Sequence, residues 1–241
     1  MFETLLEFVP MRIIRIMVAR KRRINRKERA AQDAFIAKIG IKKPKTDKPI
    51  IVAIIGLVGS GKSSVAHDLA EHIGATVIAG DDIRIELHKQ SAGYEQAYAI
   101  AENVAIEVAK QGGNIILDSD FVDAKKRASV REKAHAAGIR LIFIRTVCDF
   151  DVMSQRIREN DPGEFFRRAS TKSTAPDHGK DVKFREMTRR KPHHYHWINR
   201  GGGQWILKQF PFAIFAEIET TDTNSWKRAV RKCAKQLLTE T

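Results

Sequence analysis

The chain has 241 residues, of which 43% are hydrophobic and 30% are charged, and its formal net charge is +14. This length and composition suit one α/β domain with a sizeable core and some additional chain. Residues 1–48 contain 14 Lys and Arg but only 5 Asp and Glu, so +9 of the charge lies there. The two cysteines are far apart and form no CxxC pair, as expected of reduced residues in a cytoplasmic protein.

The start of the chain is first apolar and then strongly basic. One Glu, one Pro and two Arg interrupt residues 5–19, which therefore fall short of the ~20 uncharged apolar residues of a membrane-spanning helix. The basic run at 20–23 follows the apolar stretch, whereas an export signal places its positive charge first. We expect a basic amphipathic helix over 11–39 and then a polar linker, which divides the chain into 1–48 and 49–241.

Three roles are open for this basic helix. Its apolar stripe can pack on the rest of the protein, or its charge can bind an anionic membrane surface or nucleic acid. Membrane binding would make the cytoplasmic protein peripheral at the membrane. We infer no obligate protein partner.

After residue 49, β-branched apolar runs alternate with segments of helical periodicity. Strands are predicted at 50–55, 76–79, 114–117, 139–147 and 212–219. Helices are predicted at 63–73, 82–89, 94–110, 124–137, 151–158 and 225–238. Residues 160–182 are expected to be irregular and charged, within a lid at 155–190. The alternation predicts an α/β fold of three layers, in which helices cover both faces of a parallel, five-stranded sheet.

A phosphate-binding loop lies between the first predicted strand and the helix after it. The octapeptide Gly56-Leu57-Val58-Gly59-Ser60-Gly61-Lys62-Ser63 matches G-x-x-x-x-G-K-[ST]. Its glycines let backbone N–H groups turn towards phosphate oxygens, and the helix adds the positive end of its dipole. Lys62 suits the β- and γ-phosphates, and the Ser63 hydroxyl suits Mg²⁺. The predicted ATP-binding residues are Gly56, Gly59, Ser60, Gly61, Lys62, Ser63 and Ser64.

Two aspartates and an arginine follow the second predicted strand. Parallel strands deliver their carboxyl ends to the ligand edge of such a sheet, so Asp81 should face the γ-phosphate. A carboxylate there can orient an acceptor hydroxyl and accept its proton. Arg84, one helical turn further, can hold a substrate anion. Alternatively, Asp81 or Asp82 only caps the helix that begins nearby.

Further charged candidates lie after the 114–117 strand and beside the lid. Asp118 is placed to bind Mg²⁺ through a water, as a Walker B acid does, and Asp120 is a weaker candidate for contact with the acceptor. Arg156 is the preferred lid arginine for stabilising charge on the transferring phosphoryl group. The alternatives are a strand-end turn for Asp118 and a solvated basic face for Arg156.

Histidines and tryptophans gather before the last predicted strand. His193, His194 and His196 do not have the spacing of a common zinc site, so substrate contact or plain surface is favoured over a metal. Trp197 and Trp205 flank three consecutive glycines. We interpret the tryptophans as a hydrophobic anchor for a loop, with part of an acceptor pocket as the alternative.

Three motifs together resemble the P-loop kinases related to phage polynucleotide kinase, an AAA-like group with many uncharacterised predicted kinases. The motifs are GxxGSGKSS from Gly56, Gly80-Asp81-Asp82-Ile83-Arg84, and Ile115-Ile116-Leu117-Asp118 followed by Lys126-Arg127. The resemblance covers residues 50–160 and implies a parallel sheet of order 2-3-1-4-5. It also implies that Asp81 is the general base, that Arg84 contacts substrate phosphate, and that Arg156 reaches the nucleotide phosphates.

Two other kinase families share part of this pattern. The segment from Gly80 to Leu87 is similar to the D-G-D-N-x-R motif of adenylyl-sulfate kinases, but Ala79 stands where that family has its first Asp. Zeta-toxin-like kinases, which phosphorylate a nucleotide sugar, resemble the chain in the same scaffold.

These residues predict an ATP-dependent kinase that uses Mg²⁺. The γ-phosphate would move to a hydroxyl of a small, nucleotide-like or phosphorylated metabolite. One alternative is a polynucleotide 5′-hydroxyl kinase that uses the basic N-terminal helix. The other is a regulatory or binding module that depends on ATP but transfers no phosphate.

Overall fold

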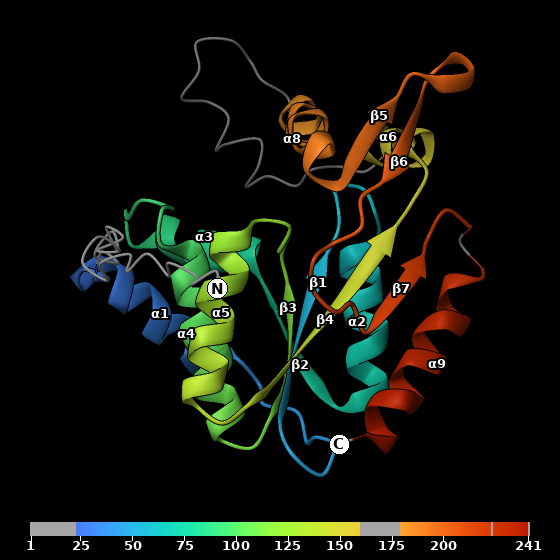
Figure 1. Ribbon diagram of the computed structural model, residues 1–241. Helices are drawn as coiled ribbons and strands as arrows, with labels where there is room; N and C mark the ends of the chain where they lie inside the picture. Colours follow the sequence, from blue (N-terminus) through green and yellow to red (C-terminus); the bar gives the residue numbers. More distant parts are fainter. Residues whose placement is uncertain (1–22, 160–178, 223, 241) are drawn as a thin grey trace, which may run out of the picture.

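A five-stranded parallel sheet forms the centre of the protein, and helices cover both of its faces (Figure 1). This computed structural model describes residues 23–159, 179–222 and 224–240. The strands of the sheet are β1 (Ile50–Ile55), β2 (Ala75–Ala79), β3 (Asn114–Asp118), β4 (Arg140–Val147) and β7 (Ala216–Glu219). A separate antiparallel hairpin comprises β5 (Tyr195–Ile198) and β6 (Gln204–Leu207), joined across the 3-10 turn η2 (Arg200–Gly202).

The helices of the described residues are α1 (Arg26–Lys38), α2 (Lys62–Ile73), α3 (Gly80–Lys89), α4 (Ala97–Lys110), α5 (Ala124–Ala136), α6 (Phe150–Glu159), α8 (Gly179–His194) and α9 (Trp226–Thr239). In this part of the chain, helices and strands alternate from α1 to α6, except that two helices, α3 and α4, lie between β2 and β3. None of the helices in the described residues has the length and apolar character that crossing a bilayer requires.

The strands of the sheet lie in the order β2-β3-β1-β4-β7, and all neighbouring pairs are parallel. Because β7 is the fifth strand of this sheet, the predicted order 2-3-1-4-5 is confirmed, together with the predicted α/β fold. The arrangement brings the carboxyl ends of β1, β2 and β3 to one edge, where Ala79 pairs with Asp118. The phosphate loop and the predicted acceptor residues follow these ends.

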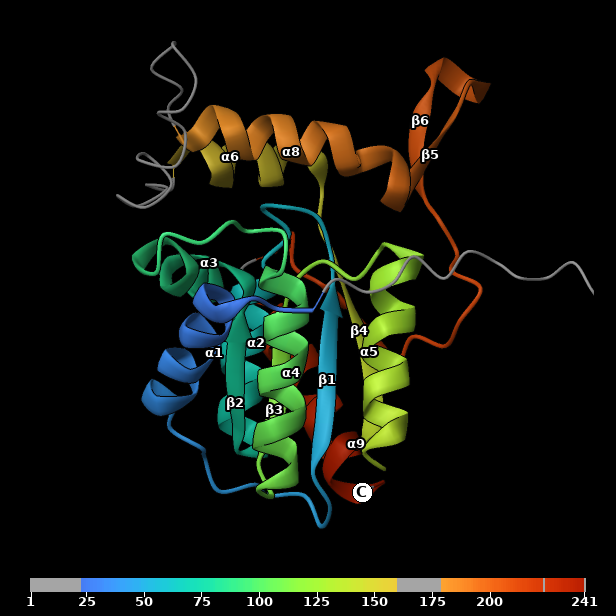
Figure 2. The ribbon, with the colours of Figure 1, turned by 90° about the vertical axis from the view of Figure 1, so that its left-hand side faces the viewer.

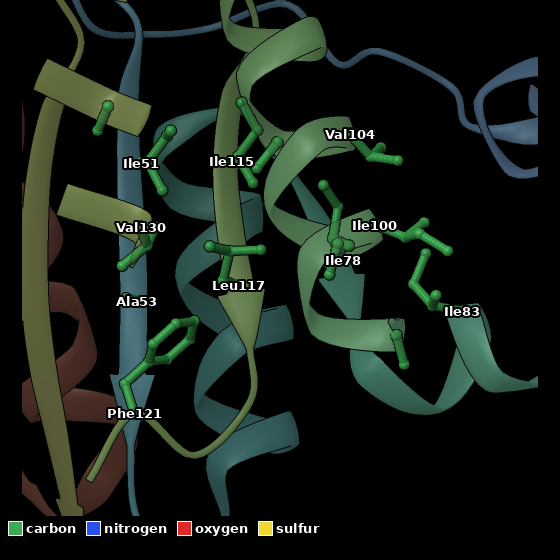
Figure 3. Close-up of a cluster of buried hydrophobic side chains, with 14 of the residues drawn as sticks. Ile51, Ala53, Ile78, Ile83, Ile100, Val104, Ile115, Leu117, Phe121 and Val130 are labelled. Atoms are coloured by element: carbon green, nitrogen blue, oxygen red, sulfur yellow. The ribbon is translucent and has the colours of Figure 1, made fainter. Parts of the chain in front are cut away.

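The central strand β1 is buried on both faces, with 0% exposure at all of its residues. Its odd-numbered side chains belong to a cluster with α3, α4 and α5, and Figure 3 shows Ile51 beside Ile115 and Ala53 near Leu117 and Phe121. Its even-numbered side chains pack against α2 and α9. Burial of each Ile or Val contributes about 1.5–3 kcal/mol. This packing holds the start of the phosphate loop in place.

Helix α1, from the basic N-terminal segment, packs on the domain. Asn25 and Glu28 form a capping box, in which Asn25 Oδ1 accepts from the Glu28 N–H and Glu28 Oε2 accepts from the Asn25 N–H. Ala31 is 1% exposed, and α1 contacts α3 and α4. The described part of the basic N-terminal segment therefore packs on the rest of the protein, which is the first of the three roles considered for it. The predicted helical residues 11–22 lie outside the described residues.

Buried hydrogen bonds join the predicted linker to the sheet. Asn114 is 0% exposed, and its Oδ1 accepts from Thr46 Oγ1 at 2.8 Å and from the Ile50 N–H at 3.0 Å. Its Nδ2 donates to the Ile73 carbonyl at 2.9 Å. Residues on both sides of the predicted boundary at 48/49 thus share one buried polar group, so the linker is packed rather than a free connection.

Residues 179–207 differ from the sequence prediction. Helix α8 begins inside the segment predicted to be irregular, and neither α8 nor the β5–β6 hairpin was predicted. Figure 2 shows α8 lying across the carboxyl edge of the sheet. Met187 of α8 is 0% exposed and packs near Met153 of α6. Arg145 of β4, 1% exposed, donates to the carbonyls of His194 and Lys208 and so fixes the base of the hairpin.

The last strand of the sheet is shorter than predicted, because β7 comprises only Ala216–Glu219. Phe210 and Phe212 stack with their ring centroids 5.0 Å apart, and Phe212 meets Phe143 edge-on at 5.5 Å. This aromatic group holds the residues before β7 against the core, so their apolar pattern reflects packing rather than a longer strand.

Candidate active site

The phosphate loop connects β1 to α2 and requires glycine at two points. Gly59 has φ +83° and Gly61 has φ +76°, a region that side chains rarely adopt. A Cβ at Gly59 would also lie 2.8 Å from the Met153 carbonyl oxygen. The backbone therefore curls tightly at the positive end of α2, which is the arrangement that cradles phosphate.

The side chain of Ser60, a residue predicted to bind ATP, is buried under the backbone of the phosphate loop. Ser60 is 2% exposed, and its Oγ is 2.8 Å from Thr146 Oγ1. The Ser60 carbonyl accepts from Thr220 Oγ1 at 2.9 Å. These bonds tie the loop to β4 and to the end of β7, so the Ser60 side chain supports the loop from below.

A cavity of about 880 Å³ lies over the carboxyl edge of the sheet. It brings together every predicted site residue except Ser60. These residues are Gly56, Gly59, Gly61, Lys62, Ser63, Ser64, Asp81, Arg84, Asp118, Asp120 and Arg156. The size suits a bound nucleotide and a small second molecule, since ligand pockets typically measure about 300–1,000 Å³.

Asp81 and Arg84 form an ion pair at the start of α3. Asp81 Oδ1 lies 2.6 Å from Arg84 Nη1, and the Asp81 side chain is 49% exposed. Helix α3 has no side-chain hydrogen bond at its cap among the described residues, so capping does not occupy either aspartate. Burial, followed by the charges of Asp81 and Asp118, raises the pKa of Asp82 above its usual value. The three carboxylates are therefore near neighbours.

Ser63 and Asp118 supply oxygen ligands of the kind that Mg²⁺ prefers. Both residues line the cavity, Ser63 from the first turn of α2 and Asp118 from the end of the neighbouring strand β3. Mg²⁺ sites commonly use one or two protein oxygens together with substrate phosphates. The residues present therefore fit the Mg²⁺ ion that accompanies a nucleoside triphosphate.

Lys62 and Arg156 contact the backbone of the phosphate loop. Lys62 Nζ donates to the Leu57 carbonyl at 2.8 Å, across the loop. Arg156 of α6 donates to the carbonyls of Gly59 and Thr220. Arg156 thus joins the loop to the end of β7, and it lines the cavity as well.

Asp120 is engaged by α8. Its Oδ2 lies 2.8 Å from Arg190 Nη2 and 3.1 Å from His194 Nε2, and its side chain is 11% exposed. Burial would raise the pKa of Asp120, but the hydrogen bond from His194 and the charge of Arg190 lower it to about 2. The carboxylate that the sequence suggested for acceptor contact therefore anchors α8 over the cavity.

The comparisons with known proteins concern the family and the fold. A family model described as an AAA domain matches residues 51–174, which is more than half of the chain. The chain belongs to this AAA domain family. A crystal structure of a candidate kinase from Chloroflexus aurantiacus superposes with a TM-score of 0.55 at 17% identity, covering 80% of this chain and 100% of that one. That likeness concerns the fold alone.

Two relatives are similar to part of this chain. An uncharacterized protein of Mycobacterium tuberculosis is 31% identical over 118 residues, which cover 42% of this chain. The match spans about a quarter, 24%, of that longer relative. A probable adenylyl-sulfate kinase of Bacillus subtilis is 29% identical over 148 residues, covering 57% of this chain and 71% of the relative. The resemblance to P-loop kinases, in part to adenylyl-sulfate kinases, is thereby confirmed.

Helix α8, which follows the matched residues 51–174, contributes cavity residues that sequence reasoning missed. Lys183, Glu186 and Arg190 line the cavity from above, and Tyr98 of α4 lines it from the side. The α8 residues are spaced by three and four positions, which is a signal for one helical face, but they lie in the predicted lid, for which no helix was predicted after residue 182. Two further arginines of the predicted lid, at 167 and 168, lie outside the described residues.

The histidines and tryptophans at 193–205 occupy different places from those expected. His194 is 2% exposed and bound to Asp120, whereas His193 and His196 are exposed. The described residues contain no group of three or more His, Cys, Asp or Glu arranged to hold a metal. Trp197 and Trp205 are exposed on the hairpin, so the interpretation as an anchor on the core was wrong.

The buried His194 predicts a stability that falls in mild acid. Burial lowers the pKa of His194 and Arg145 adds to this, against the raising effect of Asp120. In the unfolded chain a histidine binds a proton near pH 6.5, whereas His194 in the folded protein binds one only at lower pH. The free energy of unfolding therefore has its full value above about pH 6.5 and declines below it. Asp120 adds a second loss between about pH 4 and pH 2. We expect the urea midpoint of His194→Gln to depend less on pH between 7 and 5 than that of the unmodified protein. Parallel profiles would contradict this assignment.

Proposed function

We propose that this protein is an ATP-dependent phosphotransferase that moves the γ-phosphoryl group of Mg-ATP to a hydroxyl of a small anionic acceptor. The observation that carries the proposal is the shared cavity. The phosphate loop and the Asp81–Arg84 pair, which follow different strands, face the same space of about 880 Å³. A nucleotide-binding site alone would not need a carboxylate and an arginine opposite the terminal phosphate.

Each residue has a chemical role in this reaction. Asp81 orients the acceptor hydroxyl and accepts its proton as the oxygen attacks phosphorus. Lys62 leaves the Leu57 carbonyl and binds the β- and γ-phosphates, where it stabilises the charge of the transition state. Ser63 and Asp118 would hold Mg²⁺, which supplies neutralisation of the phosphate charge. Arg156 keeps the loop and the end of β7 together around the nucleotide.

The cavity favours an acceptor with an anionic group. Arg84 faces it from α3, and Lys183 and Arg190 face it from α8. Guanidinium groups are suited to phosphate, sulfate and carboxylate because their N–H groups bind two oxygens at once. The adenylyl-sulfate kinases among the relatives make adenylyl sulfate one candidate, although Ala79 replaces the first Asp of their motif.

The test is transfer of labelled γ-phosphate from Mg-ATP to a panel of acceptors. The panel holds adenylyl sulfate, nucleosides, nucleotide sugars, simple sugars and 5′-hydroxyl oligonucleotides. We expect a labelled product with one anionic class, and a rate at least about 10²-fold lower in Lys62→Ala, which removes a phosphate ligand. Tight ATP binding without a labelled product for any class would contradict the proposal and favour a regulatory module.

A further inference from the structure

We infer that the hairpin β5–β6, together with the end of α8, is a binding surface for single-stranded nucleic acid. We call residues 189–208 the tryptophan hairpin. This inference goes beyond the proposed phosphotransferase activity, because the hairpin tryptophans are not among the residues that line the cavity in the described part of the chain. Figures 1 and 2 both show the hairpin projecting from the body of the protein.

The hairpin displays two aromatic side chains to solvent. Trp197 is 50% exposed and Trp205 is 39% exposed. They lie directly opposite each other on the two strands, with ring centroids 5.5 Å apart and an interplanar angle of 63°. A two-stranded hairpin is marginally stable by itself, so two exposed tryptophans on one are unusual without a partner. Exposed indole faces are the surfaces on which unpaired bases stack.

The hairpin itself carries charge of one sign, because from Met187 to Ala216 the sequence contains no Asp or Glu. Arg189 and Arg190 are paired with Glu186 and Asp120. The basic residues that the surface contributes are therefore Lys191, Arg200 and Lys208. Lys191 Nζ lies 4.5 Å from the Trp205 ring centroid, and Arg200 at the turn is exposed. Cations interleaved with aromatic rings match a strand of phosphates interleaved with bases.

The shape of the tip favours nucleic acid over a lipid surface. A segment that inserts into a bilayer presents its apolar side chains at the part that enters. Here the turn at 199–203 is Asn-Arg-Gly-Gly-Gly, and the tryptophans lie on the flat side of the strands. Trp197 also packs against the backbone of Gly203, where an added Cβ would lie 2.2 Å from its ring. The Trp197 ring is therefore held along the hairpin rather than pointed outwards from its end, and Trp205 lies beside it.

The first experiment measures binding of a fluorescein-labelled, 5′-phosphorylated single-stranded oligonucleotide to the full chain at low salt. The 5′-phosphate blocks the terminal hydroxyl, so the result is independent of whether the protein phosphorylates anything. We expect the affinity to fall about tenfold for Trp197→Leu and for Trp205→Leu, since each loses one base-stacking face. Leucine keeps an apolar side chain on the hairpin, and circular dichroism checks that both variants are folded.

Matched controls distinguish binding at this surface from nonspecific binding elsewhere on the protein. Leu238→Ala removes an apolar residue that is 37% exposed on α9, and Lys235→Gln removes an exposed lysine of the same helix. Both should bind as the unmodified protein does. Arg200→Gln should weaken binding and reduce the salt slope by about 0.7. Equal affinity of the tryptophan variants and the unmodified protein, or no oligonucleotide binding at all, would overturn the inference.

Tryptophan fluorescence distinguishes the two kinds of partner. The chain has three tryptophans, so Trp226→Phe leaves only the two of the hairpin. Stacking of bases should quench their emission without a blue shift. A blue shift on anionic phosphatidylserine vesicles, retained in the leucine variants and without quenching by the oligonucleotide, would show a lipid surface instead and would also overturn the inference.

Discussion

Replacing Asp81 by asparagine is expected to slow phosphoryl transfer by about 10²–10⁴-fold, because the acceptor hydroxyl loses its proton acceptor. The side chain keeps its size and its place at the start of α3, where it is 49% exposed. ATP affinity should therefore change little, since the phosphate loop lies on another strand–helix connection. The measurement is a single-turnover transfer rate beside nucleotide binding by calorimetry.

The adjacent aspartate provides a matched control. Asp82 lines a separate, smaller cavity with Lys38 and His67, rather than the cavity of the phosphate loop. Asp82→Asn should leave the transfer rate within tenfold of the unmodified protein, while it removes a carboxylate whose pKa is raised by burial and by Asp81. Equal losses in both variants would show that the charge of the region matters rather than a base at Asp81. An unchanged rate in Asp81→Asn would remove Asp81 from the mechanism.

The sequence predicted those parts of the site that depend on short, contiguous motifs. The phosphate loop could be predicted because its glycines, Lys62 and Ser63 have a fixed spacing between an apolar strand and a helix. Asp118 could be predicted because it directly follows a predicted strand, and Asp81 because only Gly80 separates it from one, since parallel strands end at a common edge. The sheet order came from the resemblance to P-loop kinases, and the pairing of β7 with β4 agrees with it.

The parts that could not be predicted depend on contacts between distant segments. His194 contacts Asp120 across 74 positions of sequence, and Arg145 reaches the hairpin across 49 and 63. Neither pairing leaves a local pattern, so no helix was predicted at α8, whose first residues fall in the segment predicted to be irregular. The histidines looked like a cluster, but a helix end and a strand turn their side chains in different directions. The position of Asp120 after the 114–117 strand made it a candidate for contact with the acceptor, but that position could not reveal that its carboxylate already binds Arg190 and His194.

Asp120→Asn is expected to lower the free energy of unfolding by about 3 kcal/mol, because the mutation leaves the largely buried Arg190 without its closest anion. The Arg190 side chain is 16% exposed, and its remaining carboxylate, Glu186, lies further away at 3.5 Å. The amide also cannot accept the same charge-assisted bonds as the carboxylate. Urea denaturation at pH 7 measures the loss. The part of the acid dependence that arises between about pH 4 and pH 2 should disappear as well.

Asp123→Asn in the same loop is the matched control for stability. Asp123 caps α5 by accepting from the Lys125 N–H at 2.7 Å, and asparagine caps helices about as well as aspartate does. Its free energy of unfolding should stay within about 0.5 kcal/mol of the unmodified protein. A similar loss in both variants would mean that the loop tolerates no substitution, and would withdraw the specific role of Asp120.

The kinetic effect of Asp120→Asn separates an anchor of α8 from a residue that touches the acceptor. An anchor acts through Arg190 and Lys183, so we expect a higher KM for the acceptor, an unchanged KM for ATP, and a kcat reduced by less than tenfold. A double-mutant cycle with Arg190→Gln should show coupling in the free energy of unfolding of at least about 1 kcal/mol, as expected for residues in one ion pair. If Asp120 instead touches the acceptor, kcat falls steeply, stability is unchanged and the two substitutions are additive. Because the carboxylate already binds two groups of α8, we expect coupling.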